Sequence, residues 1–265
     1  MQIGYLISDL DQLDNVAAWG FDYAEALPGV LDPHLTDPDR AGGPEERDSL
    51  RRLESSSVSV PVLCGFIPAP EQHGLMVVGP DVDSARLRAY VARLFDLMQR
   101  ASIGVIGYGS GGSRWVPDGF PRDRALDQLR DFLHLCGDVG EPRGVKVALE
   151  PYNRDDANLL NTVPEALEFV RDLDCSHVQL MADFFHMRLN GESDDELLEA
   201  GPFLIHGHIA EPGRGRPQTT SEQHAAYLLA LRQAGYEGRV TQTGDLPAYA
   251  TPAAAAAALV AVARS

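Results

Sequence analysis

Short apolar runs alternate with amphipathic stretches along the whole chain. Apolar runs bounded by Gly, Pro and Asp are typical of buried strands, whereas apolar residues three and four positions apart indicate helices. Leu87, Val91, Leu94 and Leu97 show the helical spacing. Strands are expected at 3–7, 21–26, 59–63, 103–107, 145–149, 177–182, 203–209 and 239–243. Helices are expected at 11–19, 44–55, 83–100, 122–136, 164–172, 194–200, 221–234 and 252–262.

This alternation predicts an α/β protein with a (β/α)8 barrel, because each predicted strand is followed by a helix. No linker divides the chain, so one barrel domain is expected over residues 1–265. A doubly wound open sheet is the competing architecture, but it usually carries a glycine-rich turn after its first strand. Ser8-Asp-Leu-Asp11 occupies that position, which disfavours a dinucleotide-binding fold.

Composition and charge exclude several classes of function. Hydrophobic residues make up 44% of the 265 residues, enough for a large core, and the net charge of −17 argues against a nucleic-acid-binding surface. The three cysteines are widely spaced, which predicts neither a disulfide framework nor a zinc knuckle and fits a reducing cytoplasm. The first residues form a predicted strand without the basic segment of a signal peptide, and the alanine-rich run 253–263 is too short to span a membrane.

Acids and histidines stand at or directly after three successive predicted strands. They are Glu150, Asp183, His186, His206, His208 and Glu211. Each alone is more ordinary as a buried polar group or a helix cap, but together they favour a site. One imidazole and two carboxylates form a hard, mixed oxygen and nitrogen ligand set, which suits Mn²⁺, Mg²⁺, Co²⁺ or Zn²⁺. His206 and His208 share a strand face, and His208 is the better ligand candidate because it is nearer the rim.

Two glycine-rich turns are candidates for the mouth of a pocket. Gly109-Ser-Gly-Gly-Ser113 lacks the Gly-Lys-Ser/Thr ending of a phosphate loop, so a rim turn is expected, followed by Arg114 and Trp115 near the pocket mouth. Pro212-Gly-Arg-Gly215 directly follows the strand at 203–209. Its Arg214 either reaches a substrate oxygen or is solvated, and the sequence leaves both open.

Several blocks of this sequence are similar to one family of barrel enzymes. They are Leu149-Glu-Pro-Tyr-Asn-Arg154, Leu159-Leu-Asn-Thr162, Ala182-Asp-Phe-Phe-His186, Gly207-His-Ile-Ala-Glu211, Pro212-Gly-Arg-Gly215 and Gly235-Tyr-Glu-Gly238. In these blocks the chain resembles the xylose-isomerase-like barrels, a family that includes sugar isomerases and epimerases related to hydroxypyruvate isomerase and D-tagatose 3-epimerase. The resemblance is specific for the superfamily and gives little information on the substrate.

The resemblance implies roles for individual residues. Glu150, Asp183 and His208 match the metal ligands of such epimerases, and Glu150 would double as an acid/base group. The positions that match substrate-binding residues are Asp156, His186 and Arg214.

The last predicted strand departs from the family pattern. Relatives carry a glutamate there that is both a ligand and the second acid/base, whereas this chain has Thr243. Gln242 would reach the site only after a one-residue shift, which turns a strand side chain to the other face, and Asp245 follows in the loop. Weak metal binding is therefore expected, because ligand charge is a main determinant of affinity for a hard cation.

The leading hypothesis is a metal-dependent isomerase or epimerase that moves a proton through an enediolate of a sugar or related hydroxy-carbonyl compound. Glu150 would remove the proton, while Glu211, Asp245 or a water would return it, and a lyase-type step stays open. The main alternative is a non-catalytic barrel that binds a sugar-like ligand or acts as a partner subunit. A DNA-repair endonuclease on the same barrel is disfavoured by the negative charge. The resemblance leaves a homo-oligomer open.

Overall fold

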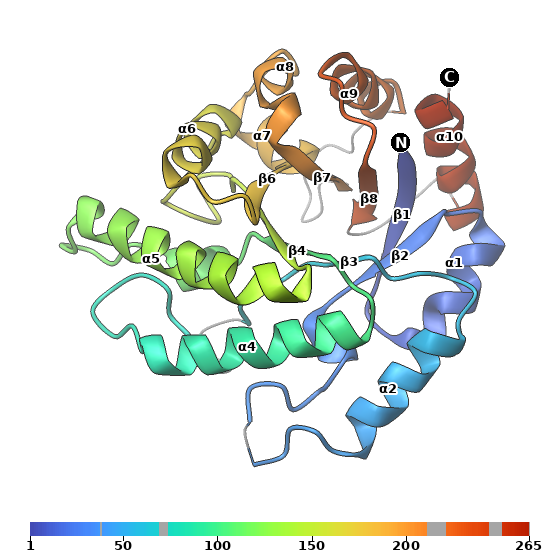
Figure 1. Cartoon of the computed structure of the whole chain (residues 1–265). Helices are drawn as coiled ribbons and strands as arrows, with labels where there is room; N and C mark the ends of the chain where they lie inside the picture. Colours follow the sequence, from blue (N-terminus) through green and yellow to red (C-terminus); the bar gives the residue numbers. More distant parts are fainter. Residues whose placement is uncertain (38, 69–73, 211–220, 244–250, 265) are drawn as a thin grey trace.

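The protein is a closed barrel of eight parallel strands. The structure is a computed structural model of the chain, and it describes residues 1–37, 39–68, 74–210, 221–243 and 251–264. Each strand pairs with the next along the chain, and the last pairs with the first, which closes the sheet (Figure 1). The strands are β1 (Gln2–Ile7), β2 (Tyr23–Ala26), β3 (Val62–Leu63), β4 (Val105–Tyr108), β5 (Lys146–Leu149), β6 (Val178–Asp183), β7 (Leu204–Ala210) and β8 (Arg239–Thr243). The predicted (β/α)8 barrel is thereby confirmed.

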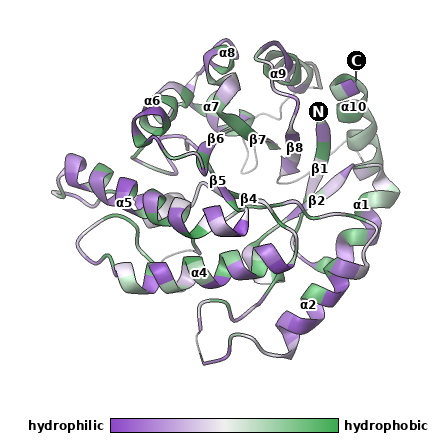
Figure 2. Ribbon diagram, in the orientation of Figure 1, coloured by the Kyte–Doolittle hydropathy of each residue, from purple (hydrophilic) through white to green (hydrophobic). Residues whose placement is uncertain are grey.

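Helices form a ring around this barrel. They are α1 (Leu13–Trp19), α2 (Pro44–Ser55), α4 (Ser84–Arg100), α5 (Arg122–Gly140), α6 (Val163–Leu173), α7 (Phe184–Asn190), α8 (Glu196–Ala200), α9 (Ser221–Gln233) and α10 (Pro252–Arg264). Hydrophobic positions recur between hydrophilic ones along α2, α4 and α5 (Figure 2). In α4 the buried residues Leu87, Val91, Leu94 and Met98 follow the helical period. Within the described residues, no helix is long and apolar enough to cross a membrane.

The element boundaries agree closely with the sequence pattern. The predicted ranges 44–55 and 239–243 coincide with α2 and β8. The predicted strand 59–63 is shorter in the structure, where only Val62 and Leu63 are in β3, preceded by Pro61, which has no N–H to donate. Helix α7 was not predicted, because its seven residues give too little apolar repetition to recognise.

Several polar side chains are buried inside the barrel. Tyr23 fills the space next to Gly4, where an added Cβ would lie 2.3 Å from the tyrosine ring. Above it, the inward positions of β2, β7 and β8 are Glu25, His206 and Thr241, all fully buried. A buried polar group costs free energy unless it is hydrogen-bonded, so these side chains must have partners inside the barrel.

Candidate metal centre

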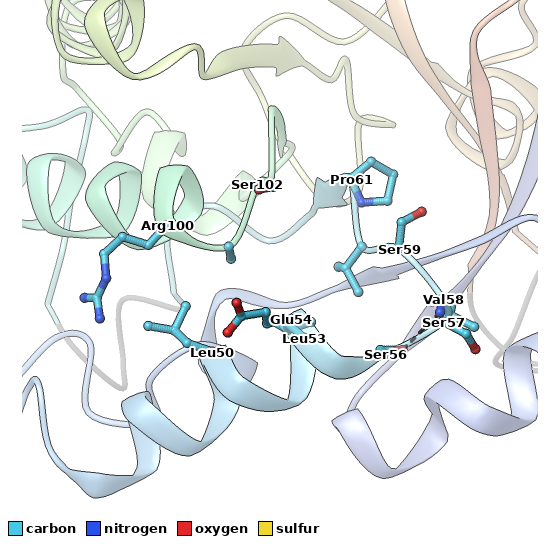
Figure 3. A pocket seen from close by; sticks show the side chains of 12 residues that line it. Leu50, Leu53, Glu54, Ser56, Ser57, Val58, Ser59, Pro61, Arg100 and Ser102 are labelled. Carbon is cyan, nitrogen blue, oxygen red and sulfur yellow. Dashed lines mark hydrogen bonds between the residues drawn. The ribbon is translucent and has the colours of Figure 1, made fainter.

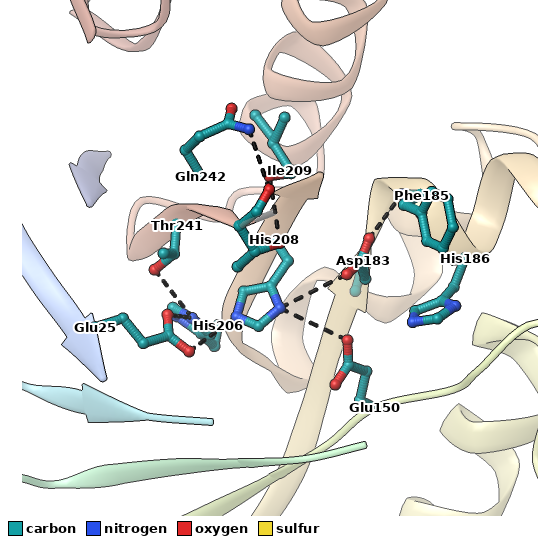
Figure 4. Close-up of polar contacts among 12 residues, drawn as sticks. Glu25, Glu150, Asp183, Phe185, His186, His206, His208, Ile209, Thr241 and Gln242 are labelled. Carbon is teal, nitrogen blue, oxygen red and sulfur yellow. Dashed lines mark hydrogen bonds and ion pairs between the residues drawn. The ribbon is translucent and has the colours of Figure 1, made fainter. Parts of the chain in front are cut away.

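Three successive strands bring metal-type side chains together at the carboxyl-terminal end of the barrel. Glu150 directly follows β5, Asp183 ends β6, and His208 lies near the end of β7. The Nδ1 atom of His208 is 3.6 Å from Glu150 Oε1 and 3.6 Å from Asp183 Oδ2 (Figure 4). One ligand atom from each residue lies within 4.8 Å of the others, and all three residues are buried. We call these three residues the rim cluster.

Local structure holds Asp183 in place. The β6–β7 pairing shifts register between Leu180 and Met181, after which Asp183 pairs with His208. Asp183 also caps α7, since its Oδ1 accepts a hydrogen bond of 2.7 Å from the backbone N–H of Phe185. One carboxylate oxygen is therefore occupied by the helix cap, and the other faces His208.

Glu25 binds the opposite side of the His208 ring. Its Oε1 is 3.0 Å from Nε2 of His208, and its Oε2 is 2.8 Å from Nε2 of His206. An ionised carboxylate only accepts hydrogen bonds, so both imidazoles donate through Nε2. His206 lies one layer deeper than His208, as the sequence predicts.

A second set of polar residues continues below the rim cluster. Thr241 Oγ1 is 3.4 Å from His206 Nε2 and 2.8 Å from the hydroxyl of Tyr23. We call Glu25, His206, Thr241 and Tyr23 the inner layer. It connects the bottom of the barrel to the rim cluster through Glu25.

Oppositely charged groups lie close together in this region. Burial alone would lower the pKa of His208, but Glu25, Asp183 and Glu150 outweigh it and raise this pKa well above its ordinary value. Burial would likewise raise the pKa of Glu25, yet His208 and His206 hold it well below its usual range. Three carboxylates thus surround one imidazole in a water-poor region, which is an arrangement that a cation would stabilise.

His186 lies beside the rim cluster on α7 and is held in one tautomer. Its Nδ1 is 2.8 Å from Nδ2 of Asn153 and 3.3 Å from the backbone N–H of the same residue. Two donors therefore point at Nδ1, which must accept and leaves the proton on Nε2. The ring stacks on Tyr152 with a centroid separation of 4.0 Å. Asp156 is exposed, and its Oδ2 accepts a 2.6 Å hydrogen bond from Asn153.

The glycine-rich turn at 109–113 supports the loop that follows β5. A Cβ on Gly109 would lie 2.3 Å from the Tyr152 ring, and one on Gly111 would lie 2.2 Å from the backbone oxygen of Asp156. Glycine is required for this close approach, and no phosphate-loop role is needed to explain it. The interpretation of this stretch as a rim turn agrees with the structure.

Arg114 does not face a pocket mouth, which corrects the expectation from the sequence. The side chain is fully buried, and its Nη2 donates to the backbone oxygen of Glu150 at 2.5 Å. Its guanidinium lies 5.6 Å from the ring centre of Tyr108 and 5.5 Å from that of Tyr152. Trp115, in contrast, is 41% exposed. Arg114 therefore holds the backbone at Glu150.

Strand β8 brings no charged ligand to the rim. Thr243 is buried, and its hydroxyl lies 3.5 Å from the backbone oxygen of Ile209. Thr241 binds inside the barrel, so the side-chain alternation of a strand places Thr243 on the inner face and Gln242 on the outer one. Gln242 donates to the backbone oxygen of Thr243 at 3.2 Å. The predicted positions Glu211, Arg214 and Asp245 lie outside the described residues.

A hollow of about 710 Å³ opens at the other end of the barrel (Figure 3). It lies between the ends of α2 and α4 and the segment 56–61 that leads into β3. Barrel enzymes place their chemistry at the carboxyl ends of the strands, whereas this hollow is at the amino ends. Its charged residues are Glu54 and Arg100, which form no metal-type group. The hollow is therefore not a second candidate for the metal centre.

Glu25 is the residue of this region that the sequence pattern did not single out. It stands between Ala24 and Ala26 in a predicted buried strand. A lone acid in a buried strand needs a buried partner, so the sequence could have indicated that Glu25 takes part in a polar cluster. The identity of the partners was not available, because His206 and His208 are far away in sequence.

Fold and site geometry define a barrel with a metal-type ligand set, and comparison with known proteins assigns its family. The model of the xylose isomerase-like TIM barrel matches residues 13–256, so the chain belongs to this family, as its resemblance indicated. D-psicose 3-epimerase of Agrobacterium fabrum is 32% identical over 157 residues, which cover 58% of this chain and 54% of that protein. The chain thus matches about half the length of this relative.

Two further proteins extend the similarity over more of the chain. D-psicose 3-epimerase of Ruminiclostridium cellulolyticum is 29% identical over 241 residues, which cover 86% of this chain and 75% of that protein. The apo form of 3-keto-D-glucoside 4-epimerase from E. coli has a TM-score of 0.77 at 20% identity, covering 100% of both chains. At this identity the structural likeness establishes the fold.

Proposed function

We propose that this protein is a divalent-metal-dependent epimerase or isomerase of a ketose or a related hydroxy-carbonyl compound. The observation that carries the proposal is the convergence of Glu150, Asp183 and His208 at the strand ends. The relatives named above are epimerases, which supports the same reaction class.

The rim cluster fits a hard cation such as Mn²⁺, Mg²⁺, Co²⁺ or Zn²⁺. Glu150, Asp183 and His208 would hold it, because they offer two carboxylates and one imidazole nitrogen. The carboxylate of Glu150 faces Nδ1 of His208 at 3.6 Å, which is longer than an ordinary hydrogen bond and leaves room for a shared ligand between them. When bound, the cation would polarise a substrate carbonyl and acidify the adjacent C–H bond.

Glu150 is the proposed proton acceptor. Its backbone is held by Arg114, which keeps the carboxylate at a fixed position after β5. A base must lie within hydrogen-bond reach of the proton it removes, so a rigid backbone at this residue favours transfer.

His186 is the proposed partner of a substrate oxygen. Because Asn153 fixes its tautomer, the Nε2–H is available to donate to a hydroxyl or carbonyl of the substrate. We assign Asp156 to the support of Asn153 and propose that Arg214 binds a substrate oxygen.

The second acid/base cannot come from β8, where Thr243 stands. Thr243 cannot replace a carboxylate in proton transfer, since its hydroxyl does not ionise near neutral pH. We propose Glu211 for this role, with Asp245 as the alternative. An isomerisation that uses Glu150 alone requires no second acid, so a one-base isomerase is the simpler form of the proposal.

The neutral residue at Thr243 also supports a second candidate, a barrel that binds a sugar-like ligand without catalysis or serves as a partner subunit. The test is incubation of the Mn²⁺-supplemented protein in D₂O with D-fructose, D-psicose, D-tagatose and hydroxypyruvate. NMR would follow deuterium incorporation next to the carbonyl. The proposal predicts metal-dependent incorporation that Glu150→Gln abolishes. Ligand-induced stabilisation without incorporation would favour the non-catalytic barrel.

A further inference from the structure

Glu25 is an acid inside the barrel whose two oxygens bind two different imidazoles. It is 0% exposed and lies on β2, while both of its partners come from β7. A carboxylate in such a position is costly unless both oxygens are satisfied, and the two Nε2–H groups satisfy them. The contact therefore joins the inner layer to the rim cluster.

The hydrogen bonds of Glu25 determine which nitrogen of His208 is free. Since Glu25 accepts at both oxygens, the Nε2 of His208 carries a proton. The other ring nitrogen, Nδ1, faces Glu150 and Asp183 at 3.6 Å, which is longer than a hydrogen bond. A metal ligand must present an unprotonated nitrogen, and this arrangement reserves Nδ1 for that purpose.

We propose that Glu25 is a positioning residue that orients His208 and commits its Nδ1 atom to the metal centre. This inference rests on the proposed function. Carboxylates that accept the second N–H of a metal-bound histidine fix the orientation of the ring and raise its basicity as a ligand. Glu25 also adds negative charge behind the ring, on a site where β8 supplies none.

Glu25, His206 and His208 are close enough to be considered as a metal site of their own. The distances of 2.8 and 3.0 Å are hydrogen-bond lengths, and the bonds use both oxygens of Glu25 and the Nε2 atoms of both imidazoles. The group is also buried below the rim cluster. Its geometry is that of a support for His208, so we expect one ion for each chain.

Glu25→Gln tests the proposal with Glu46→Gln as its matched control. Glutamine has a donor nitrogen in place of one carboxylate oxygen, so it cannot accept from both imidazoles at the two positions where the Glu25 oxygens now accept. Glu46 is also a buried acid that bridges two partners, Arg93 at 2.6 Å and Arg100 at 2.7 Å, but it lies on α2. Isothermal titration calorimetry of metal-free protein with Mn²⁺ is expected to show affinity about 10–100-fold lower for Glu25→Gln and unchanged for Glu46→Gln.

The state of the imidazole gives a second readout that does not depend on activity. In ¹H–¹⁵N spectra of the metal-free wild type, the buried Nε2–H groups of His206 and His208 should give slowly exchanging signals. At least one of them should be lost or strongly shifted in Glu25→Gln. If Glu25→Gln does not fold, Glu25→Asp replaces it, because its shorter side chain cannot span both rings.

The outcomes separate this inference from the proposed function. Mn²⁺ affinity that stays at the wild-type value in Glu25→Gln would overturn the positioning role, as would two ions bound to each chain. A loss of affinity in His206→Gln as large as in Glu25→Gln would also overturn it, since general packing would then be the cause. No binding by the wild type at all would refute the metal centre itself, on which this inference rests.

Discussion

The rim cluster and the inner layer each combine a glutamate with a histidine but differ in what their atoms contact. In the inner layer, both Glu25 oxygens take part in hydrogen bonds, and the Tyr23 and Thr241 hydroxyls bind each other. In the rim cluster, Nδ1 of His208 and the acids around it are separated by 3.6 Å. Satisfied polar groups hold a structure, whereas carboxylates that converge on one imidazole nitrogen beyond hydrogen-bond distance leave room for a cation. We therefore propose that the inner layer supports the site and that the rim cluster binds the cation.

Adding an acid at the rim should produce the largest gain in metal affinity. Thr243→Glu is expected to raise Mn²⁺ affinity by about 10–100-fold, because ligand charge is a main determinant of affinity for a hard cation. Isothermal titration calorimetry would measure it, with Thr243→Gln as a neutral control of the same length. Equal affinity in all three proteins would mean that the side chain at Thr243 does not reach the metal centre.

Blocking the close approach between the turn at 109–113 and the loop after β5 should lower the stability of the folded protein. Gly111→Ala places a Cβ 2.2 Å from the backbone oxygen of Asp156, and we expect a loss of about 1–3 kcal/mol in the free energy of unfolding. Gly29→Ala is the control, because an added Cβ there meets nothing within 4 Å. Urea denaturation would compare the two, and equal stability would show that the glycine turn does not need its close approach.

Sequence reasoning identified the fold and the rim cluster because both follow from local patterns. The strand-ending positions of Glu150, Asp183 and His208 are visible from apolar runs alone. The role of Glu25 was not visible, since its partners are brought near only by closure of the barrel. The burial of Arg114 was also missed, because a charged residue after a glycine turn is ordinarily at the surface. Both the partners of Glu25 and the burial of Arg114 depend on tertiary contacts between segments that are distant in sequence.

A smaller effect is expected from a change at the bottom of the inner layer. Tyr23→Phe removes the 2.8 Å hydrogen bond to Thr241 and should lower the free energy of unfolding by about 1 kcal/mol. Thermal or urea unfolding of the metal-free protein would measure this loss. The Mn²⁺ affinity should fall less than in Glu25→Gln, and a larger fall would contradict the separation between the two regions.

A pH dependence is expected outside both regions. Burial raises the pKa of Glu192 to about 7, and the nearby Glu196 adds to this effect. Protonation of Glu192 therefore favours the folded state, so its contribution is present below pH 4.5 and is lost as the pH rises through about 7. Glu192→Gln should remove this dependence and be more stable than the wild type at pH 8. Urea unfolding of both proteins at pH 5 and pH 8 would measure the dependence. The prediction is contradicted if the free energy of unfolding changes equally with pH in the wild type and in Glu192→Gln.

The metal centre is tested most directly by Mn²⁺ binding to the wild type and to Asp183→Asn. Asparagine keeps an oxygen for the cap of α7, where Asp183 now accepts from Phe185, but it removes the charge of the ligand. Calorimetry and metal analysis are expected to show saturable binding of one ion per chain by the wild type and none by the variant. Equal binding by the two proteins, or no binding by either, would contradict a metal centre at Glu150, Asp183 and His208.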